Sequence, residues 1–290
     1  MSSPADARPV VVETIAALRE ALAPSGSAPE RTVALVPTLG ALHEGHLALV
    51  ARATGLAETV VVSIFVNPTQ FGANEDLAKY PRDLGADLDL LEGRGVDYVF
   101  APAVDEMYPD GATQVKVTGG RVAELFEGRS RPGHFDGVLT VVAKLLGIVR
   151  PQSVVFGQKD AQQVFLVQRM VLDLDIPTAV DVVETVRADD GLALSSRNRY
   201  LDPDARRAAR ALSRALEAAA SSSDRGIDAV LAAAQSVLMD EDLVKLDYLK
   251  VVNPRTFLPV DDGYRGPARV LIAAKVGSTR LIDNDAIYLN

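Results

Sequence analysis

Two histidines, His43 and His46, lie three residues apart in the decapeptide 37–46 and are separated by Glu44 and Gly45. Imidazoles donate hydrogen bonds to phosphate oxygens and can transfer protons near neutral pH. Gly45 has no side chain, so a ligand can lie close against the backbone there. The chain has only three histidines, and two of them are in this segment. The segment is a candidate anion site, although histidines near a helix start also serve as capping or solvated residues.

The elements on either side of the decapeptide must position these imidazoles. An apolar run at 32–36 precedes it, and Leu47, Leu49 and Val50 follow at helical spacing. A β-branched run, a turn with Pro and Gly, and helical periodicity predict a strand, a loop and a helix. We expect this geometry to direct backbone N–H groups and a helix N-terminus toward a phosphate.

Strand and helix patterns alternate over the following part of the chain. The predicted strands are at 32–36, 59–66, 96–100, 153–156 and 179–185. Helical spacing predicts helices near Ile15–Leu22 and at 47–50, 83–94, 138–149 and 164–174. This alternation is typical of βαβ units, so we predict an α/β fold with a Rossmann-like, doubly wound parallel sheet. Polar clusters follow these strands, where ligands bind in open α/β sheets.

The pattern changes after Val186. Two Ala-rich helical stretches at about 203–219 and 226–239 precede strand-like runs at 244–252 and 269–276. We predict two domains: a Rossmann-like nucleotide-binding domain over residues 1–186 and a smaller α+β C-terminal domain over residues 187–290.

Composition excludes several classes of protein. The formal charge of −9 and the pI near 4.9 argue against a nucleic-acid partner. The absence of cysteine excludes disulfides and thiolate chemistry. No signal-peptide pattern and no run of about 18 apolar residues is present, so we expect a cytoplasmic protein without a membrane partner. With 48% apolar residues in 290, the chain can bury a substantial core.

Two further polar segments follow predicted strands or turns, at 157–160 and 195–197. Lys159 can reach a phosphate and Asp160 can bind a sugar hydroxyl, or the two can be a solvated lysine and an N-cap. The two serine hydroxyls and Arg197 suit phosphate oxygens, or they form a polar surface loop. Taken alone, neither segment decides between these interpretations.

Other polar residues also allow two interpretations. Asn67 and Gln70 can hold a small polar substrate or satisfy loop backbone. Arg131 and His134 can meet an anion or belong to a basic loop. Acidic residues at helical spacing can supply a Mg²⁺ ligand or form a solvated face: Asp83, Asp87 and Asp89.

Several well-known motifs are absent from the sequence. No Walker loop and no Gly-x-Gly-x-x-Gly is present, which disfavours P-loop ATPases and dinucleotide enzymes. His43 and His46 do not match His-Glu-x-x-His, and without cysteine a zinc site has little support.

The His43–His46 turn is similar to the His-x-Gly-His signature of nucleotidylyltransferases and class I aminoacyl-tRNA synthetases. More narrowly, five segments together resemble pantoate–β-alanine ligases, the pantothenate synthetases. The segments are Pro37–His46, Phe65–Phe71, Arg131–Gly137, Phe156–Gln163 and Leu194–Tyr200. The resemblance covers essentially the full chain, in order and spacing.

This resemblance implies an ATP-dependent ligase that makes pantothenate, a precursor of coenzyme A. Pantoate attacks the α-phosphorus of ATP, pyrophosphate leaves, and pantoyl adenylate forms. The amine of β-alanine then attacks the acyl carbonyl and releases AMP and pantothenate. Mg²⁺ accompanies ATP, and a homodimer is expected by analogy. The alternatives are another nucleotidylyltransferase of the superfamily and a nucleotide-sensing module without turnover; the acidic charge disfavours a tRNA ligase.

The resemblance also implies roles for individual residues. The catalytic residues are His43, His46, Lys159, Ser195, Ser196 and Arg197. The ATP-binding residues are Leu39, Gly40, Ala41, Leu42, His43, Glu44, Gly45, His46, Gly157, Gln158, Lys159, Asp160, Val186, Leu194, Ser195, Ser196 and Arg197. Pantoate is assigned to Asn67, Gln70, Arg131, His134 and Gln163, and β-alanine to Gln70. His46 either donates a proton or donates an N–H as a neutral ring. Asp87 is the suggested protein ligand of Mg²⁺, which is held mainly on the ATP phosphates, and segment 67–80 or the second domain is a candidate lid.

The sequence departs from the family's usual residues at a few positions. Leu39, Thr69 and Leu194 stand where methionine is usual, and Thr69 is the polar one, which can alter the fit around pantoate. Gln158 and Ala161 replace a usual acid and a usual aromatic, both peripheral to the proposed chemistry.

Overall fold

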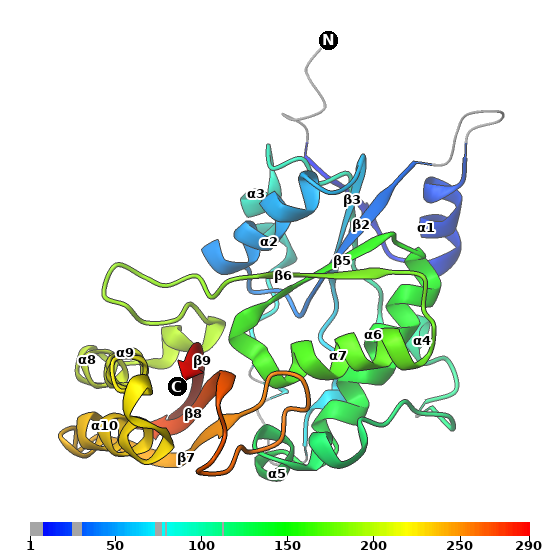
Figure 1. Cartoon of the computed structure of the whole chain (residues 1–290). Coiled ribbons are helices and arrows are strands. Elements are labelled where there is room, and N and C mark those ends of the chain that lie inside the picture. Colours follow the sequence, from blue (N-terminus) through cyan, green and yellow to red (C-terminus); the bar gives the residue numbers. More distant parts are fainter. Residues whose placement is uncertain (1–7, 25–30, 73–76, 79, 112) are drawn as a thin grey trace. The chain divides into compact units, whose positions relative to one another are not determined.

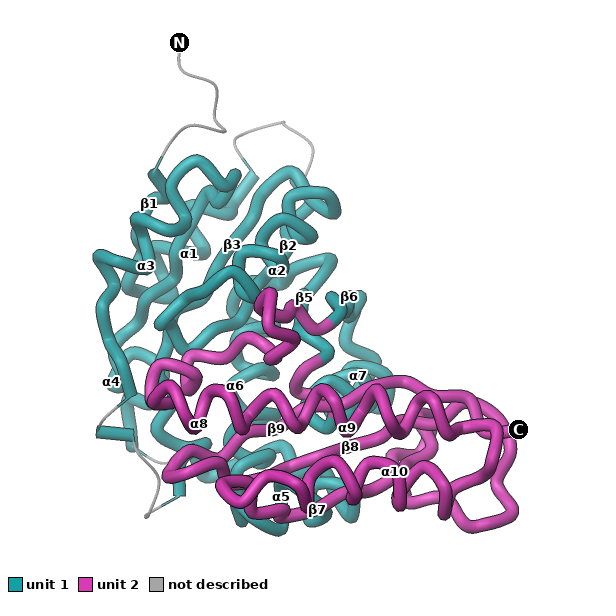
Figure 2. Tube along the Cα trace, turned by 90° about the vertical axis from the view of Figure 1, so that its left-hand side faces the viewer, with its two compact units in different colours: residues 1–158, 162–184 teal, residues 159–161, 185–290 magenta. Residues whose placement is uncertain are grey.

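The computed structural model describes residues 8–24, 31–72, 77–78, 80–111 and 113–290. Segment 67–80, the candidate lid, lies partly outside this description, at 73–76 and 79. The chain divides into two compact units, residues 1–158 with 162–184 and residues 159–161 with 185–290 (Figure 2). The domain boundary predicted after residue 186 lies two residues beyond the change of unit at 184.

A six-stranded sheet organises the first unit, in the order β1-β4-β3-β2-β5-β6. The strands are β1 Val10–Val12, β2 Val33–Thr38, β3 Thr59–Ile64, β4 Tyr98–Phe100, β5 Ser153–Gly157 and β6 Ala179–Val183. All five neighbouring pairs are parallel. The predicted α/β class with a parallel sheet is therefore confirmed. The three-residue strand β1 was not predicted, because so short a run carries no periodicity.

Helices cover both faces of this sheet (Figure 1). The helices of this part of the chain are α1 Ile15–Leu22, α2 Glu44–Thr54, α3 Leu84–Leu91, α4 Val104–Met107, α5 Glu127–Ser130, α6 His134–Val149 and α7 Ala161–Asp173. Successive residues of β2 alternate between two cores: Val33 and Leu35 belong to the core with α1, α6 and α7, and Ala34 and Val36 to the core with α2 and α3. Burial of both faces explains why β2 and β3 read as continuous apolar runs.

The order of the strands creates a topological switch point beside β2. From β2 the chain proceeds through β3 to β4 on one side, whereas β5 and β6 lie on the other. In open α/β sheets, ligands bind outside the carboxyl ends of the strands at such a point. The carboxyl end of β2 leads into the histidine segment, and the carboxyl end of β5 is Gly157.

The second unit contains a three-stranded antiparallel sheet, β7 Val244–Val252, β8 Gly266–Val276 and β9 Thr279–Leu289. Helices α8 Pro203–Ala209, α9 Ala211–Ala220 and α10 Ile227–Met239 pack on it through a core of Ala, Leu, Ile and Val side chains. The helix predicted at 203–219 is two helices that meet at Arg210. Strand β9 was not predicted, and it carries residues important for the site described below.

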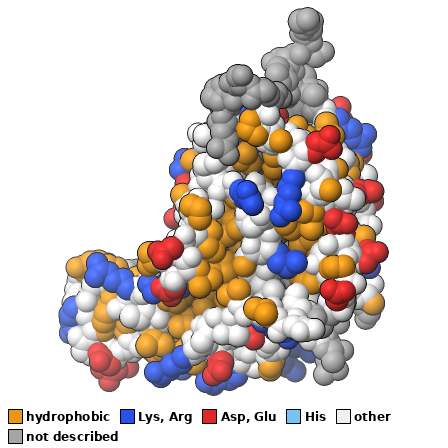
Figure 3. Space-filling model, turned by 90° about the vertical axis from the view of Figure 1, so that its right-hand side faces the viewer, with side chains coloured by type: hydrophobic (Ala, Val, Ile, Leu, Met, Phe, Trp, Pro, Cys, Tyr) orange, Lys and Arg blue, Asp and Glu red, His pale blue; other side chains and the backbone are white. Residues whose placement is uncertain are grey.

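Basic and acidic side chains lie interspersed on the face drawn in Figure 3. Among the residues described, no helix combines the length and the apolar character needed to cross a bilayer.

Candidate active site

The loop after β2 has a backbone that only a few residue types adopt easily. Gly40 has a φ of +79° and Ala41 a φ of +53°, and the left-handed region favours glycine. Thr38 fixes the turn: its hydroxyl donates to the carbonyl of Ser63 at 2.8 Å and accepts the N–H of Gly40 at 3.2 Å. The end of β2 is thereby tied to β3, and the chain turns toward α2.

Asp87, on α3, holds the other side of this loop. Its carboxylate accepts the N–H of Leu42 at 2.7 Å and the N–H of Ala41 at 3.0 Å. The residue is only 3% exposed, so the prediction of a solvated acidic face is wrong for Asp87. Asp83 instead caps α3, and Asp89 is exposed and pairs with Arg8. Because both Asp87 oxygens accept backbone N–H groups, its placement fits an anchor of the histidine loop better than a Mg²⁺ ligand.

The two imidazoles are locked by the backbone that carries them. The Nδ1 of His43 accepts the N–H of Gly45 at 3.1 Å, and the Nδ1 of His46 accepts the N–H of His43 at 3.3 Å. The ring centroids are 4.1 Å apart. A ring nitrogen that accepts a hydrogen bond carries no proton, so the neutral rings bear theirs on Nε2. In this tautomer the N–H donor of each histidine is therefore on Nε2.

The backbone of the loop behaves differently from the prediction. The N–H groups of Gly40, Ala41, Leu42, His43 and Gly45 all donate within the protein. They are therefore not directed at a phosphate, as the strand–loop–helix pattern had suggested. The capacity of this loop to bind an anion lies mainly in its imidazoles.

The predicted pantoate residue Asn67 lies behind Gln70 and supports it. Asn67 has no exposed surface, and its Nδ2 donates to Gln70 Oε1 at 3.1 Å and to the carbonyl of Gly137 at 3.2 Å. Its Oδ1 accepts the Tyr108 hydroxyl at 2.8 Å and the Thr69 hydroxyl at 2.9 Å. Burial raises the pKa of the Tyr108 phenol, which keeps it a donor. Since Oε1 is occupied, Gln70 can offer its Nε2 donors to a ligand.

His134 and Arg131 hold the backbone of the same loop. The Nδ1 of His134 contacts the carbonyl oxygen of Gln70 at 2.8 Å, and a guanidinium N–H of Arg131 donates to that oxygen at 3.3 Å. A carbonyl only accepts, so Nδ1 carries the proton, and Nε2 accepts from Arg131 at 2.9 Å. Both side chains were predicted to contact pantoate, but the structure places them on the carbonyl of Gln70.

Gly137 gives a test of how closely α6 packs against this loop. A Cβ added at Gly137 would lie 2.3 Å from the Thr69 carbonyl oxygen and 2.7 Å from Gln70 Cα. We expect Gly137→Ala to lower the free energy of unfolding by about 1–3 kcal/mol and to raise KM for pantoate, as Gln70 is displaced. Gly147→Ala, in the same helix with nothing within 4 Å of its Cβ, is the matched control. Equal pantoate KM values in the two folded variants would contradict the expectation.

The two glutamines at the start of α7 have different environments. Gln162 is 4% exposed, donates to the carbonyls of Val122 and Leu125, and accepts the N–H of Glu127. It therefore fixes the segment before α5. Gln163 is half-buried and remains the candidate for a substrate contact.

In the second unit, residues 186–194 form a tight hairpin that leads to the serine segment. The N–H of Leu194 donates to Val186 at 2.9 Å, which places these two predicted ATP residues side by side. Gly191, with a φ of +85°, closes the turn. The hydroxyl of Ser195 accepts the N–H of Arg197 at 3.3 Å and caps the short 3₁₀ helix Ser196–Tyr200.

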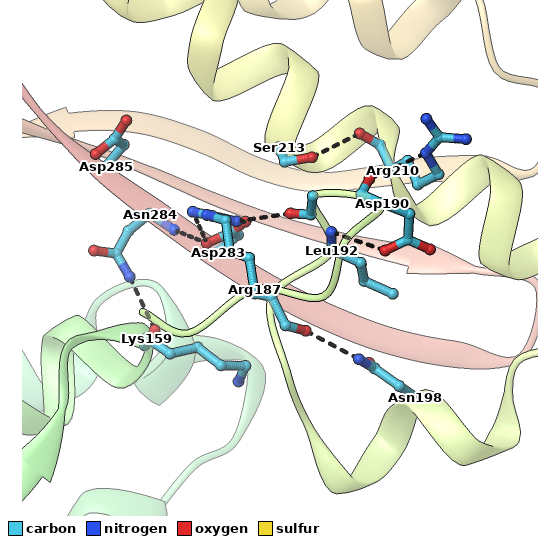
Figure 4. A network of polar contacts seen from close by, with 12 residues as sticks. Lys159, Arg187, Asp190, Leu192, Asn198, Arg210, Ser213, Asp283, Asn284 and Asp285 are labelled. Atoms are coloured by element: carbon cyan, nitrogen blue, oxygen red, sulfur yellow. Dashed lines mark hydrogen bonds and ion pairs between the residues drawn. The ribbon is translucent and has the colours of Figure 1, made fainter. Parts of the chain in front are cut away.

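Ion pairs brace this hairpin (Figure 4). Arg187 donates to both oxygens of Asp283, at 2.6 and 3.1 Å, and to the carbonyl of Gly191. Burial opposes the charge of Arg187, but the hydrogen bond and charge of Asp283 raise the pKa of the guanidinium. Burial also opposes the charge of Asp190 and by itself would raise the pKa of that carboxyl. The hydrogen bond from the Leu192 N–H and the nearby Arg206 outweigh this effect and lower the pKa below its ordinary value.

Lys159 and Asp160 follow the end of β5 in the 3₁₀ turn Gln158–Asp160. The Lys159 side chain is 17% exposed, and its Nζ lies 3.9 Å from Asp160 Oδ1. The carbonyl of Lys159 accepts the side-chain amide of Asn284 at 2.9 Å (Figure 4). Sequence reasoning missed Asp283 and Asn284. The available signal was three consecutive polar residues, Asp283–Asp285, interrupting the run Leu281–Ile287 near the end of the chain.

Among the described residues, no three His, Asp or Glu side chains form a group that could hold a metal ion. With the oxygens of Asp87 bonded to backbone N–H groups, the donor set does not provide a protein cage for Mg²⁺.

A parallel sheet with two imidazoles at its switch point defines a nucleotide-binding α/β protein of the His-x-Gly-His kind. The sequence profile of pantoate-beta-alanine ligase matches residues 10–286. The pantothenate synthetase of Leifsonia xyli subsp. xyli is 60% identical over 274 residues, which cover 94% of this chain and 95% of that protein.

Solved structures agree with this match. The pantothenate synthetase of Thermus thermophilus superposes with a TM-score of 0.90 at 48% identity, covering 96% of this chain and 99% of that one. The Francisella tularensis pantoate-beta-alanine ligase, complexed with beta-gamma ATP and beta-alanine, has a TM-score of 0.78 at 33% identity, covering 96% and 97%. The chain therefore belongs to the pantoate–β-alanine ligase family. The predicted resemblance is confirmed, and with it the assignment as a ligase that joins pantoate to β-alanine.

Proposed function

We propose that this ligase works through a pantoyl-adenylate intermediate. The carboxylate of pantoate attacks the α-phosphorus of ATP, and the bond from that phosphorus to the β-phosphate oxygen breaks to release pyrophosphate. The amine of β-alanine then attacks the acyl carbonyl, loses a proton, and displaces AMP. The observation that carries this proposal is the pair of imidazoles, His43 and His46, each locked with Nδ1 as an acceptor and Nε2 as the donor.

Adenylate formation needs positive, preorganised groups around phosphorus and the leaving group more than it needs covalent chemistry. In this proposal His46 and His43 donate Nε2–H bonds to phosphate oxygens. Donation by a neutral ring is favoured over proton transfer from the Nε2 of an imidazolium, because an imidazolium also carries a proton on Nδ1, which would oppose the backbone N–H that this nitrogen accepts. Lys159 and Arg197 supply charge, and Ser195 and Ser196 supply hydroxyls, to the same phosphates.

The remaining predicted residues bind the other groups of the substrates. Leu39–Leu42, Glu44, Gly45, Gly157, Gln158, Asp160, Val186 and Leu194 are proposed to line the ATP site. Gln70 and Gln163 bind pantoate, and Gln70 also lies near β-alanine. The contacts of Asn67, His134 and Arg131 with the loop of Gln70 support a role in orienting Gln70 rather than direct contact with pantoate.

Mg²⁺ is proposed to enter with ATP, bound to its phosphates. When bound there, it neutralises charge on the departing pyrophosphate. The chain's contribution is the set of cationic and N–H donors named above.

The test is pyrophosphate release from ATP and Mg²⁺ with pantoate alone, with β-alanine alone, and with both. We expect sustained release only with both, together with AMP and pantothenate, and about one pyrophosphate per site with pantoate alone. Release that needs no amine and leaves a nucleotide on the product would favour another nucleotidylyltransferase. Folded protein that binds ATP without pantoate-dependent release would favour the nucleotide-sensing module.

A homodimer, which the resemblance implies, and the cytoplasmic location expected from the sequence also belong to this proposal. Sedimentation of the purified chain tests the first: a single species with the 30.9 kDa mass of the monomer would contradict it. Fractionation of the source cells tests the second.

A further inference from the structure

Two adjacent residues of β9, Asp283 and Asn284, contact Lys159 and the hairpin 186–194 that leads to the serine segment. Each is only 4% exposed. A buried charge or amide is costly unless it is fully hydrogen-bonded, and both are bonded to groups near the proposed chemistry (Figure 4). Neither residue lies in one of the five segments that carry the family resemblance.

Asn284 fixes the backbone at Lys159. Its Oδ1 accepts from the guanidinium of Arg269 at 2.5 Å, and its Nδ2 donates to the Lys159 carbonyl at 2.9 Å. Arg269 can only donate, and a carbonyl can only accept, so the amide has a single satisfactory orientation. The backbone from which the Lys159 side chain extends is therefore held by a residue of β9.

Asp283 fixes the hairpin that precedes Ser195. It accepts two hydrogen bonds from Arg187 and, on Oδ1, the N–H of Asn284 at 2.8 Å. Arg187 in turn donates to Gly191 at the tip of the hairpin. The shared bond between Asp283 and the Asn284 backbone joins the two anchors into one network.

A buried ion pair contributes little net stability compared with apolar side chains of similar size, whereas loss of one partner is strongly destabilising. The bidentate Arg187–Asp283 pair, with Asp283 almost fully buried, therefore points to a role in geometry. The hairpin that the pair braces leads to Ser195–Arg197, which under the proposed function act in phosphoryl transfer, where a displacement of about 1 Å can cost about 100-fold.

We propose that Asp283 and Asn284 are positioning residues for adenylate formation: Asn284 sets the position of Lys159, and Asp283 sets Ser195–Arg197 through Arg187. This inference rests on the proposed roles of Lys159 and Arg197. It predicts that the first step depends on the pair more than the second step does, because only the first moves charge between phosphates.

The test compares Asn284→Asp and Asp283→Asn with Asp247→Asn. Asp247 accepts from Arg280 in the same sheet, at 2.7 and 3.0 Å, and so provides for Asp283→Asn a matched loss of one carboxylate charge. Pantoate-dependent exchange of pyrophosphate into ATP measures the first step, and β-alanine attack on preformed adenylate measures the second. We expect the exchange kcat to fall about 10- to 100-fold in the first two variants, with a much smaller change in the second step and in KM. Asp247→Asn is expected to retain the exchange rate.

Double variants test whether the effect passes through the named partners. If Asn284 acts through Lys159, Asn284→Asp should cost little more once Lys159→Ala is present, and Asp283→Asn should cost little more beside Arg197→Ala. Independent, multiplicative losses would overturn the proposal, as would unchanged exchange in folded Asn284→Asp. Equal losses in both steps that track the melting temperature would overturn it in favour of a merely structural role. A lack of effect of Lys159→Ala and Arg197→Ala themselves would instead refute the residue roles under the proposed function.

Discussion

Replacing His46 with alanine is expected to lower kcat for pantoate-dependent pyrophosphate release by about 10²- to 10³-fold, the usual cost of removing one preorganised donor from a developing charge. Nε2 of His46 is the donor in question, because Nδ1 already accepts the N–H of His43. Steady-state rates with saturating ATP and both substrates measure the effect. Binding of ATP in the ground state should change far less, since the interaction strengthens in the transition state.

Two further substitutions separate the donor from the helix cap. His46→Asn can keep an acceptor near the position of Nδ1 for the N–H of His43 but has no group at the position of Nε2. His46→Gln can place an amide N–H near the position of Nε2 and loses the cap. We expect the asparagine variant to retain the melting temperature without the activity, and the glutamine variant to recover part of the rate. The opposite order of activities would show that His46 acts mainly as a cap.

The sequence was sufficient to predict the sheet and the loop that carries the histidines. The runs that became β2 and β3 are buried on both faces, so their continuous apolar character reports directly on a parallel sheet. The turn residues at 37–46 fixed the change from strand to helix. Both signals come from neighbouring residues in the sequence, so they can be recognised without knowledge of the tertiary contacts.

The use made of each polar group could not be predicted in the same way. Two of the loop N–H groups expected to face a phosphate, those of Ala41 and Leu42, are bonded to Asp87, 45 or more residues away. Asn67 and His134 form hydrogen bonds with Gln70, in the loop after β3, although both were expected to contact a substrate. Such pairings depend on tertiary contacts between distant segments, and residue type alone does not distinguish a side chain that binds substrate from one that supports it.

Asp283 and Asn284 illustrate the same limit from the other direction. Their strand, β9, pairs with β8 along its whole length, from Thr279 to Leu289. Some alternation of polar and apolar residues was visible there, but three consecutive polar residues in its centre, Asp283–Asp285, interrupt the apolar pattern that identifies a strand. Two of these residues link the strand to Lys159 and Arg187.

Asp87→Ala is expected to lower the free energy of unfolding by about 3 kcal/mol, because it leaves two buried backbone N–H groups, of Ala41 and Leu42, without their charged acceptor. The loop would then lose its anchor, and kcat for adenylate formation should fall by up to about 100-fold as His43 and His46 shift. Chemical denaturation measures the first effect, and pyrophosphate exchange in protein that remains folded measures the second.

Asp83→Asn is the matched control for this prediction, because Asp83 lies just before the same helix, α3, and only caps its N-terminus. Asparagine is as good a cap as aspartate, so we expect little change in stability or rate. Asp87→Asn keeps one oxygen acceptor, but its side-chain NH₂ group would face the second backbone N–H. We therefore expect an intermediate loss of stability. If Asp87→Asn left stability unchanged and raised Mg²⁺ restored its activity, Asp87 would be a metal ligand. If stability and rate fall together and Mg²⁺ has no effect, its carboxylate serves the enzyme by holding the histidine loop against α3.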